Sequence, residues 1–381
     1  MTFGELAVIG LIGLLGPLLA LPSRWHLPVV LGELAAGAAL GASGFGYLDA
    51  TEPTFRFLAD IGFALVMFVA GTHIPVRARS STAALRAGVL RAVLIGLVAV
   101  GLGVGIARLF GLPHWSLYAV LIASSSAALV LPTLDSLGLR GRAVGDLVPQ
   151  VAVADAFCIV ALPLAVDPAH APRAALGAVV VLATAAAICA GLWWLDRVGV
   201  RRRVHVVSER RRFALELRIQ LVLLCLIAAI AVGTHVSIML AGFAFGLAVN
   251  IVGEPRRLAR QLFALTEGFF GPLFFVWLGA SLQLRNLGDH PAMLGLGLAL
   301  GLGAVLAHLA ASLLGQPAPL GLVAAAQIGV PSAAVAIGAE EGLLRPGEGS
   351  ALMLGALVTI AFAVVGGSVA ARSQTSGSGR S

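Results

Sequence analysis

The sequence contains no lysine, so all 25 of its basic residues are arginine, and charged residues of both signs make up only 11% of the 381 positions. Cysteine is also rare: Cys158, Cys189 and Cys225 lie in separate apolar runs, too scattered for a metal site. A net charge of +7 would suggest nucleic-acid binding in a soluble chain, but the arginines lie mainly in short segments between apolar runs. Because 59% of the residues are hydrophobic, we expect an integral membrane protein in a lipid bilayer, with no nucleic-acid partner.

Long apolar runs fill most of the chain. A run of about 20 apolar residues crosses a bilayer as a helix. Thirteen candidates are present, at residues 3–21, 27–43, 57–74, 88–110, 115–135, 145–166, 174–195, 213–232, 236–252, 268–284, 292–314, 319–339 and 349–371. The sequence therefore predicts an all-α membrane protein with about thirteen transmembrane helices.

The arginines divide unequally between the two sets of loops. Loops after odd-numbered runs, with the C-terminal tail, hold most of them: Arg24, Arg77, Arg79, Arg86, Arg140, Arg142, Arg197, Arg201, Arg202, Arg203, Arg210, Arg211, Arg212, Arg256, Arg257, Arg260, Arg372 and Arg380. Loops after even-numbered runs hold Arg56, Arg108, Arg173, Arg285 and Arg345. Because cytoplasmic loops carry most basic residues, we expect the N-terminus outside and the C-terminus in the cytoplasm, with the chain in the inner or plasma membrane.

Two halves of the chain resemble each other. The run ADIGFALVMFVAGTHI (59–74) has a counterpart in TEGFFGPLFFVWLGASLQL (266–284), and GELAAGAALG (32–41) has one in MLAGFAFGLAV (239–249). The paired helices are seven apart in order, so they cross the membrane in opposite directions. This pattern predicts an inverted repeat of six plus six helices around a linking helix at 174–195, an architecture found in many secondary transporters.

The same offset pairs the two most interrupted runs, 115–135 and 319–339. Proline and small polar residues allow a helix to unwind and turn backbone groups toward an ion or a cavity. The first run contains Ser124, Ser125, Ser126 and Pro132, and the second contains Gln327, Gly329, Pro331 and Ser332. Matched interruptions in two halves indicate a binding site near the middle of the membrane.

Asp155 is a lone carboxylate about ten residues into the apolar run VPQVAVADAFCIVALPLAV. An ionisable group at that depth costs a few kcal/mol and usually marks an ion or proton path. A bound cation favours the charged carboxylate, whereas desolvation favours the protonated one, so cation and proton compete for Asp155. We expect oxygen ligands for a monovalent cation from Asp155, Ser124, Ser125, Ser126, Gln327 and carbonyls freed near Pro132.

Two other polar residues are accessory candidates. Glu33 lies about two turns into the second run, where a role in packing or at a cavity mouth competes with ion binding. His308 lies on the apolar run 292–314, where a satisfied core histidine competes with a proton relay. Pro132 and Pro331 are the remaining accessory positions.

At these residues the chain resembles the monovalent cation:proton antiporter superfamily, which includes sodium/proton exchangers and the membrane domain of potassium-efflux proteins. The resemblance covers nearly the whole chain and rests on LPVVLGELAAGAALG (27–41), LADIGFALVMFVAGT (58–72), SSSAALVLPTL (124–134), AVADAFCIVALPL (152–164), ELRIQLVLLCLIAAIAVGTHVSIMLAGFAFGLA (216–248) and GFFGPLFFVWLGASLQL (268–284). It implies a sodium/proton antiporter-like fold with two crossed broken helices, and it matches Asp155 to the ion-binding and proton-carrying aspartate of that family.

The resemblance also implies a division of the antiporter domain, residues 1–371, into two parts. Residues 1–84 and 213–284 would form a dimerisation part, and residues 85–166 and 292–371 a core transport part, with 174–195 as linker and a homodimer as the assembly. Transport would proceed by elevator-type alternating access. Residues 372–381 are expected to form a disordered tail.

Three departures from the family pattern bear on the coupling. Ala154 precedes Asp155 where electrogenic members carry a second aspartate, no lysine is present to pair with the acids, and Gly329 and Val330 stand where Gly-Glu is common. With one carboxylate, exchange of one cation for one proton is expected. Two alternatives stay open: a channel-like or non-transporting membrane sensor of the same fold, and a sodium-coupled symporter of an organic anion.

Motifs of enzymes are missing from the sequence. It has no Walker loop, no cluster of metal ligands and no nucleophile elbow with placed partners. We therefore expect a protein that is not an enzyme and has no cofactor, and whose partners are a proton and a transported Na⁺ or K⁺. Selectivity between these two ions depends on cavity size and field strength, which the sequence does not specify.

Overall fold

The computed structural model describes residues 1–20, 29–72, 82–166, 171–211, 213–234, 236–253, 256–282, 285 and 291–378, and every regular element in these ranges is a helix. The first half contains α1 (Phe3–Gly13), α2 (Leu15–Ala20), α3 (Val29–Leu40), α4 (Pro53–Thr72), α5 (Thr82–Phe110), α6 (Trp115–Ala123), α7 (Ala127–Ser136), α8 (Arg142–Val166) and α9 (Ala171–Arg197). The second half contains α10 (Val200–Arg211), α11 (Leu215–Gly233), α12 (Ile238–Val252), α13 (Arg256–Leu265), the π-helix η2 (Thr266–Phe270), α14 (Gly271–Ser281), α16 (Pro291–Leu309), the 3₁₀-helix η3 (Ala310–Leu314), α17 (Ala318–Ala324), α18 (Gly329–Glu340) and α19 (Glu348–Ser378).

The helices confirm the all-α membrane architecture. In the described part of the chain, nine helical stretches are long and apolar enough to cross a membrane, and two apolar stretches, Phe3–Leu19 and Ile238–Val252, are shorter. Each of the thirteen predicted runs overlaps a helix or a pair of helices. The number of thirteen crossings and the inverted order of the two halves stay predictions, because nine stretches alone reach full spanning length.

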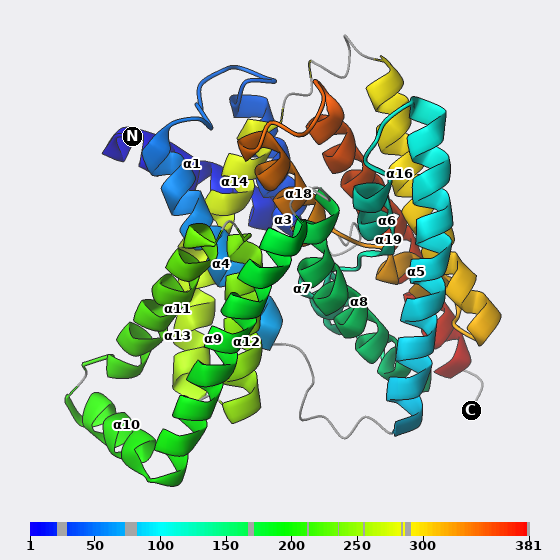
Figure 1. Ribbon diagram of the computed structural model, residues 1–381. Coiled ribbons are helices and arrows are strands. Elements are labelled where there is room, and N and C mark those ends of the chain that lie inside the picture. The colour runs from blue at the N-terminus through cyan, green and yellow to red at the C-terminus, as the bar shows by residue number, and fades with distance from the viewer. Residues whose placement is uncertain are drawn as a thin grey trace.

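Two regions differ from the sequence-based expectation. The arginine-rich stretch after α9 forms a helix of its own, α10, which lies at the opposite end of the bundle from α1 (Figure 1). The second region is the C-terminal end, where α19 continues as a helix through residues 372–378 and a disordered tail was expected. Residues 379–381 lie outside the described part. Alanine, arginine and glutamine at 370–374 are good helix formers, and the apolar helix before them supplies the costly nucleus.

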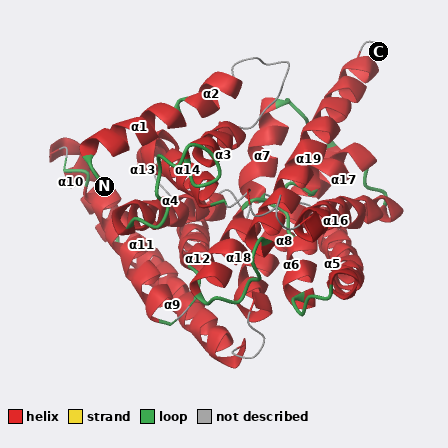
Figure 2. Cartoon of the chain, turned by 90° about the horizontal axis from the view of Figure 1, so that it is seen from above, coloured by secondary structure: helices red, strands yellow, loops and turns green. Residues whose placement is uncertain are grey.

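The helices form two groups that lie side by side (Figures 1 and 2). The first group contains α1–α4, α9 and α11–α14, and the second contains α5–α8 and α16–α19. Contacts within each group are extensive, whereas the groups meet chiefly where α4 packs on α7 and where α9 and α12 pack on α8.

Glycines allow the helices of the first group to approach each other closely. A Cβ atom added to Gly246 of α12 would lie 2.0 Å from the carbonyl oxygen of Phe68 in α4. One added to Gly37 of α3 would lie 2.1 Å from the carbonyl oxygen of Val276 in α14. Helices in lipid associate through such small residues, because apolar lipid offers no hydrophobic driving force between them. These two contacts make the first group a tightly packed unit.

A buried polar network ties α6 to α19 in the second group. Glu348, the first residue of α19, is fully buried. Its Oε1 accepts a hydrogen bond of 2.5 Å from the Tyr118 hydroxyl and lies 2.7 Å from Nδ1 of His114. Its other oxygen, Oε2, accepts from the backbone N–H of Arg345 at 2.9 Å. A buried carboxylate requires such partners, so this network holds the starts of the two helices together.

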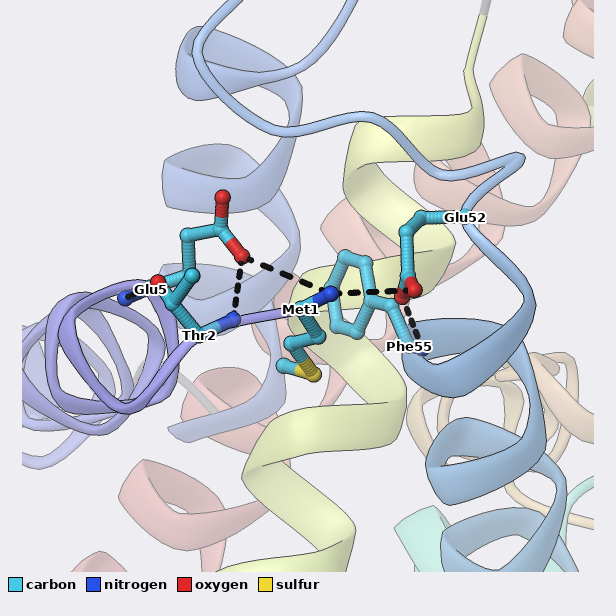
Figure 3. A network of polar contacts seen from close by, with 5 residues as sticks. All are labelled: Met1, Thr2, Glu5, Glu52 and Phe55. Carbon is cyan, nitrogen blue, oxygen red and sulfur yellow. Dashed lines mark hydrogen bonds and ion pairs between the residues drawn. The ribbon is translucent and has the colours of Figure 1, made fainter.

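The N-terminus is tied to α4 through Glu52, as Figure 3 shows. The amino group of Met1 donates to Oε1 of Glu52 at 3.1 Å, and the backbone N–H of Phe55 donates to Oε2 at 2.6 Å. Thr2 and Glu5 form a capping box at the start of α1, and Oε2 of Glu5 lies 3.9 Å from the same amino group. The hydrogen bond from Phe55, together with that from Met1, lowers the pKa of Glu52 from 4.5 to about 2.

We expect Glu52→Gln to lower the thermal stability of the detergent-solubilised protein at neutral pH, through loss of a charged cap at the helix start. Because the folded pKa is the lower one, the contribution of Glu52 is fully present above pH 4.5 and is lost as the pH falls toward about 2. The difference in melting temperature between wild type and variant should therefore narrow across this window. A difference in melting temperature that stays constant from neutral pH down to about pH 2 would contradict a stabilising role of the charged Glu52.

Candidate functional site

Two helices are broken near the middle of their runs. The first break covers residues 124–126, between the end of α6 at Ala123 and the start of α7 at Ala127. The second covers residues 325–328, between the end of α17 at Ala324 and the start of α18 at Gly329. These are the runs in which the sequence predicts interruptions, so unwound backbone is present in both.

The two breaks contact each other directly. The backbone N–H of Ser126 donates to the carbonyl oxygen of Ala326 at 2.8 Å, and the Ser125 hydroxyl donates to that of Ala324 at 2.5 Å. The Ser124 hydroxyl lies within hydrogen-bond reach of the side-chain oxygen of Gln327. All three serines and Gln327 are buried. The hydrogen bonds satisfy backbone groups that no helix pairs, which is how broken helices are tolerated at membrane depth.

Asp155 lies beside this crossing. It extends from α8, is 6% exposed, and its Oδ2 accepts a hydrogen bond of 2.9 Å from the backbone N–H of Ala127. Ala127 is the first residue of α7, so the carboxylate lies at a helix N-terminus, where the partial positive charge of the helix favours an anion. Among the described residues no group donates a hydrogen bond to its other oxygen, Oδ1. One oxygen of Asp155 is therefore held by the protein while the other is available to a ligand.

A cavity of about 800 Å³ lies between the two helix groups and reaches the crossing. Ala127, Ile328, Gly329 and Ser332 line it from the second group. Ala127 is the residue whose amide binds Asp155, so the cavity ends close to this carboxylate.

The prolines do not mark the breaks. Helix α7 continues through Pro132, whose side chain lies outside the described part, and Pro331 is the third residue of α18. Proline is tolerated in the first turn of a helix because its missing N–H has no partner there. The unwound segments instead begin at Ser124 and at Ala325. Pro132 lies past the first turn of α7, where its missing N–H leaves a carbonyl one turn earlier without that donor, so the role of a freed carbonyl near Pro132 stays a prediction.

The structure separates the two accessory candidates. Glu33 lines the cavity from α3 and is 3% exposed. His308 is 1% exposed on α16, its Nδ1 lies 2.8 Å from the carbonyl oxygen of Ala304, and it is not among the residues lining the cavity. The structure thus brings Glu33, but not His308, to the cavity that reaches the crossing.

Two features of the site are missing from the sequence-based list. The amide of Ala127 is a backbone donor, which cannot be identified from the residue type. The serine run that ends the preceding helix was the sequence feature that indicated unwound backbone there. Glu267 lines the cavity from η2, and the sequence marked it only as an acidic residue within the repeat. Its signal was the match between Asp60-Ile-Gly-Phe and Glu267-Gly-Phe, together with its place in an apolar run.

Comparison with known families identifies the class of protein. The pattern of the family described as "Sodium/hydrogen exchanger, transmembrane" matches residues 10–375. The chain belongs to this family.

Individual relatives are distant. The Na(+)/H(+) antiporter NhaS5 of Synechocystis is 29% identical over 273 residues, which are 68% of this chain and 37% of that protein. YjbQ of Bacillus subtilis is 21% identical over 300 residues, 75% of this chain and 48% of that protein, so the chain spans less than half of both relatives. Among solved structures, the sodium proton antiporter MjNhaP1 from Methanocaldococcus jannaschii superposes with a TM-score of 0.63 over 94% of each chain at 16% identity. This likeness shows a shared fold.

Proposed function

We propose that the protein is a secondary active transporter that exchanges a monovalent cation, Na⁺ or K⁺, for protons at Asp155. The observation that carries the proposal is the position of this carboxylate at the crossing of two broken helices, beside the start of α7 and near a large cavity. Membership of the exchanger family and the names of the relatives support cation and proton as the transported pair.

The chemistry at Asp155 is competition for one oxygen pair. The helix start of α7 and the Ala127 amide favour the charged carboxylate, which attracts a cation. Burial disfavours that charge when no cation is present, so the carboxylate then takes up a proton. Because the two ligands exclude each other, uptake of one releases the other, and movement of the loaded site across the membrane gives exchange.

Oxygen atoms at the crossing supply the further ligands of the cation. The hydroxyl of Ser126 has no hydrogen-bond partner among the described residues, which makes it the first choice after Oδ1 of Asp155. Ser124, Ser125 and Gln327 are already engaged with the opposing break. They complete the coordination shell in one of two ways: their side-chain oxygens bind the ion, or their hydrogen bonds hold the backbone carbonyls that bind it.

The division into two helix groups supports elevator-type alternating access. Asp155 and both breaks belong to the second group, whereas Glu33 and most of the remaining cavity lining belong to the first. Movement of the second group against the first carries the site from one side of the membrane to the other. The tight glycine packing of the first group suits the static part, through which two copies form a homodimer in the inner or plasma membrane.

The test is reconstitution into proteoliposomes that contain a pH-sensitive dye, with Na⁺, K⁺ or choline added outside. We expect Na⁺ or K⁺ to move protons in the opposite direction and choline to move none. Conductive cation flux without proton movement would favour a channel-like protein. Cation flux that requires an organic anion and leaves the pH unchanged would favour a symporter, and no flux at all would favour a sensor.

Because Asp155 is the single carboxylate found at the crossing in the described part of the chain, we expect each cycle to exchange one cation for one proton and to move no net charge. Transport should then proceed at the same rate in vesicles clamped at zero and at about 100 mV, since only an uncompensated charge gains about 2.3 kcal/mol from such a potential. A several-fold dependence on potential that His308→Ala removes would reveal a second proton carrier. That result would overturn the one-carboxylate cycle.

A further inference from the structure

Another pocket lies at the end of the second helix group, and no residue of the crossing lines it in the described part of the chain. This pocket is open, has a volume of about 610 Å³, and lies where α5 ends, α6 begins and the chain approaches α19. Arg108 from the last turn of α5 and Arg345 from the loop before α19 both line it. Its lining among the described residues includes no acidic side chain, so the pocket is basic.

The convergence of Arg108 and Arg345 requires an explanation. Loops after even-numbered apolar runs hold five arginines, and two of them, from segments distant in the chain, line this one pocket. Within the described ranges, neither guanidinium group has a hydrogen-bond or ion-pair partner. The C-terminus of α5 favours a positive charge at Arg108, but it does not account for Arg345. Because two like charges repel each other, an anion between them would stabilise this arrangement.

The first turn of α6 adds to the positive potential of the pocket. This helix begins at Trp115, which lines the pocket, and the side chain of His114 at the N-cap position accepts no hydrogen bond from that turn. Backbone N–H groups at a helix start attract anions. Phosphate binds well to arginine, because its oxygens match the paired N–H groups of a guanidinium. The lining therefore fits a phosphate group.

The surface beside the pocket is apolar and faces outward. Helix α5 lies at the outer edge of the second group in both views (Figures 1 and 2). Leu97 precedes Arg108 by about three helical turns, so the two residues share one face of α5. Leu97 is 68% exposed and Leu109 is 77% exposed, while Trp115, of a type enriched at the level of lipid headgroups, is 48% exposed. A phosphate group in this pocket would therefore belong to a lipid.

We propose that this pocket binds the phosphate group of an anionic phospholipid between Arg108 and Arg345, with the acyl chains along the exposed face of α5. The net negative charge of such a headgroup matches the two guanidinium groups. The bound lipid links the end of α5 to the loop that enters α19. Because it binds the folded protein, it stabilises this end of the second group. The site is separate from the exchange at Asp155 and does not depend on it.

Lipid titration tests this proposal. Purified protein in a neutral detergent is titrated with short-chain phosphatidylglycerol, with phosphatidylcholine of the same chain length, and with inorganic phosphate. Bound lipids are counted by native mass spectrometry, and the melting temperature is measured in parallel. We expect phosphatidylglycerol to bind several-fold more tightly than phosphatidylcholine and to raise the melting temperature. Inorganic phosphate should bind far more weakly, because it has no acyl chains to place along α5.

Substitutions locate the bound lipid. Arg108→Gln and Arg345→Gln should each weaken the binding of phosphatidylglycerol several-fold. The double variant should lose one bound lipid per chain, together with the rise in melting temperature that this lipid causes. Arg173→Gln, at an exposed arginine near the start of α9 and outside the pocket, is the matched control and should change neither quantity.

Three outcomes would overturn the proposal. Unchanged phosphatidylglycerol binding by the double variant would place the lipid elsewhere on the protein. Equal affinity for phosphatidylglycerol and phosphatidylcholine would mean that the arginines do not recognise the charge of the headgroup. Inorganic phosphate that binds as tightly as phosphatidylglycerol would mean that a free anion occupies the pocket. Both arginines are exposed, so their replacement should leave the fold intact, and the comparison of the three probes on wild-type protein needs no substitution.

Discussion

Asp155→Asn is expected to reduce cation-driven proton movement to the level of protein-free vesicles. The amide keeps the volume of the side chain, and its oxygen can still accept the hydrogen bond from Ala127, but it carries no charge for the cation and exchanges no proton. Expression and folding should change little, because an uncharged group is easier to bury than a carboxylate. The measurement is the rate of dye response in proteoliposomes after addition of Na⁺ or K⁺.

Asp146→Asn is the matched control for this experiment. Asp146 lies on the same helix, α8, about two turns before Asp155, and it is neither fully buried nor part of the crossing. Its replacement should leave exchange near the wild-type rate. Wild-type exchange by Asp155→Asn would place the site elsewhere in the molecule.

Gly246→Val is expected to prevent stable packing of the first helix group. A Cβ atom at this position would lie 2.0 Å from the backbone oxygen of Phe68, which cannot move aside as a flexible side chain can. Overpacking typically costs 1–3 kcal/mol, and a backbone clash separates α4 from α12 along their contact. We expect a melting temperature in detergent well below that of wild type and a low yield of monodisperse protein.

Gly101→Val provides the comparison. Gly101 lies on α5, with no heavy atom within 4 Å of the position that a Cβ would take. The same substitution should therefore be tolerated there. Equal stability of both variants would mean that the close approach of α4 and α12 is not required for the fold.

Much of the fold could be predicted because the bilayer imposes a simple rule. Backbone groups in lipid must pair within a helix, so apolar runs of about 20 residues mark helices without knowledge of tertiary contacts. Helix α10 was not predicted, since its arginines form no apolar run and its contacts with α9 and α11 are not visible in the sequence. The extension of α19 to Ser378 was missed for a related reason, because composition alone does not show how far a helix propagates past its apolar part.

The site could be predicted in outline but not in its contacts. Asp155 stands out by charge, and the serine run and Gln327 stand out by polarity, so the sequence identifies residues that the structure brings to one crossing. The Ala127 amide could not be found in this way, because a backbone donor has no residue type of its own. Proline misled the prediction of the breaks, since Pro331 occupies a first turn where it fits without disruption.

Cavity residues were the hardest to identify. Glu33 and His308 look equivalent in sequence, each a single polar residue in an apolar run, yet the structure brings only Glu33 to the cavity. The difference lies in helix packing, which decides the face that each residue presents. Glu267 shows the same limit, because it lines the same cavity as Glu33 although the two residues are distant in the chain.

Proton release on cation binding tests most directly whether cation and proton compete for Asp155. Purified protein is titrated with Na⁺ or K⁺ in a calorimeter, in buffers that differ in ionisation enthalpy, so that the heat reports the protons released. At a pH where Asp155 is protonated, we expect wild-type protein to release protons as cation binds and Asp155→Asn to release none. Cation binding without proton release, or equal release by both proteins, would contradict exchange at this carboxylate.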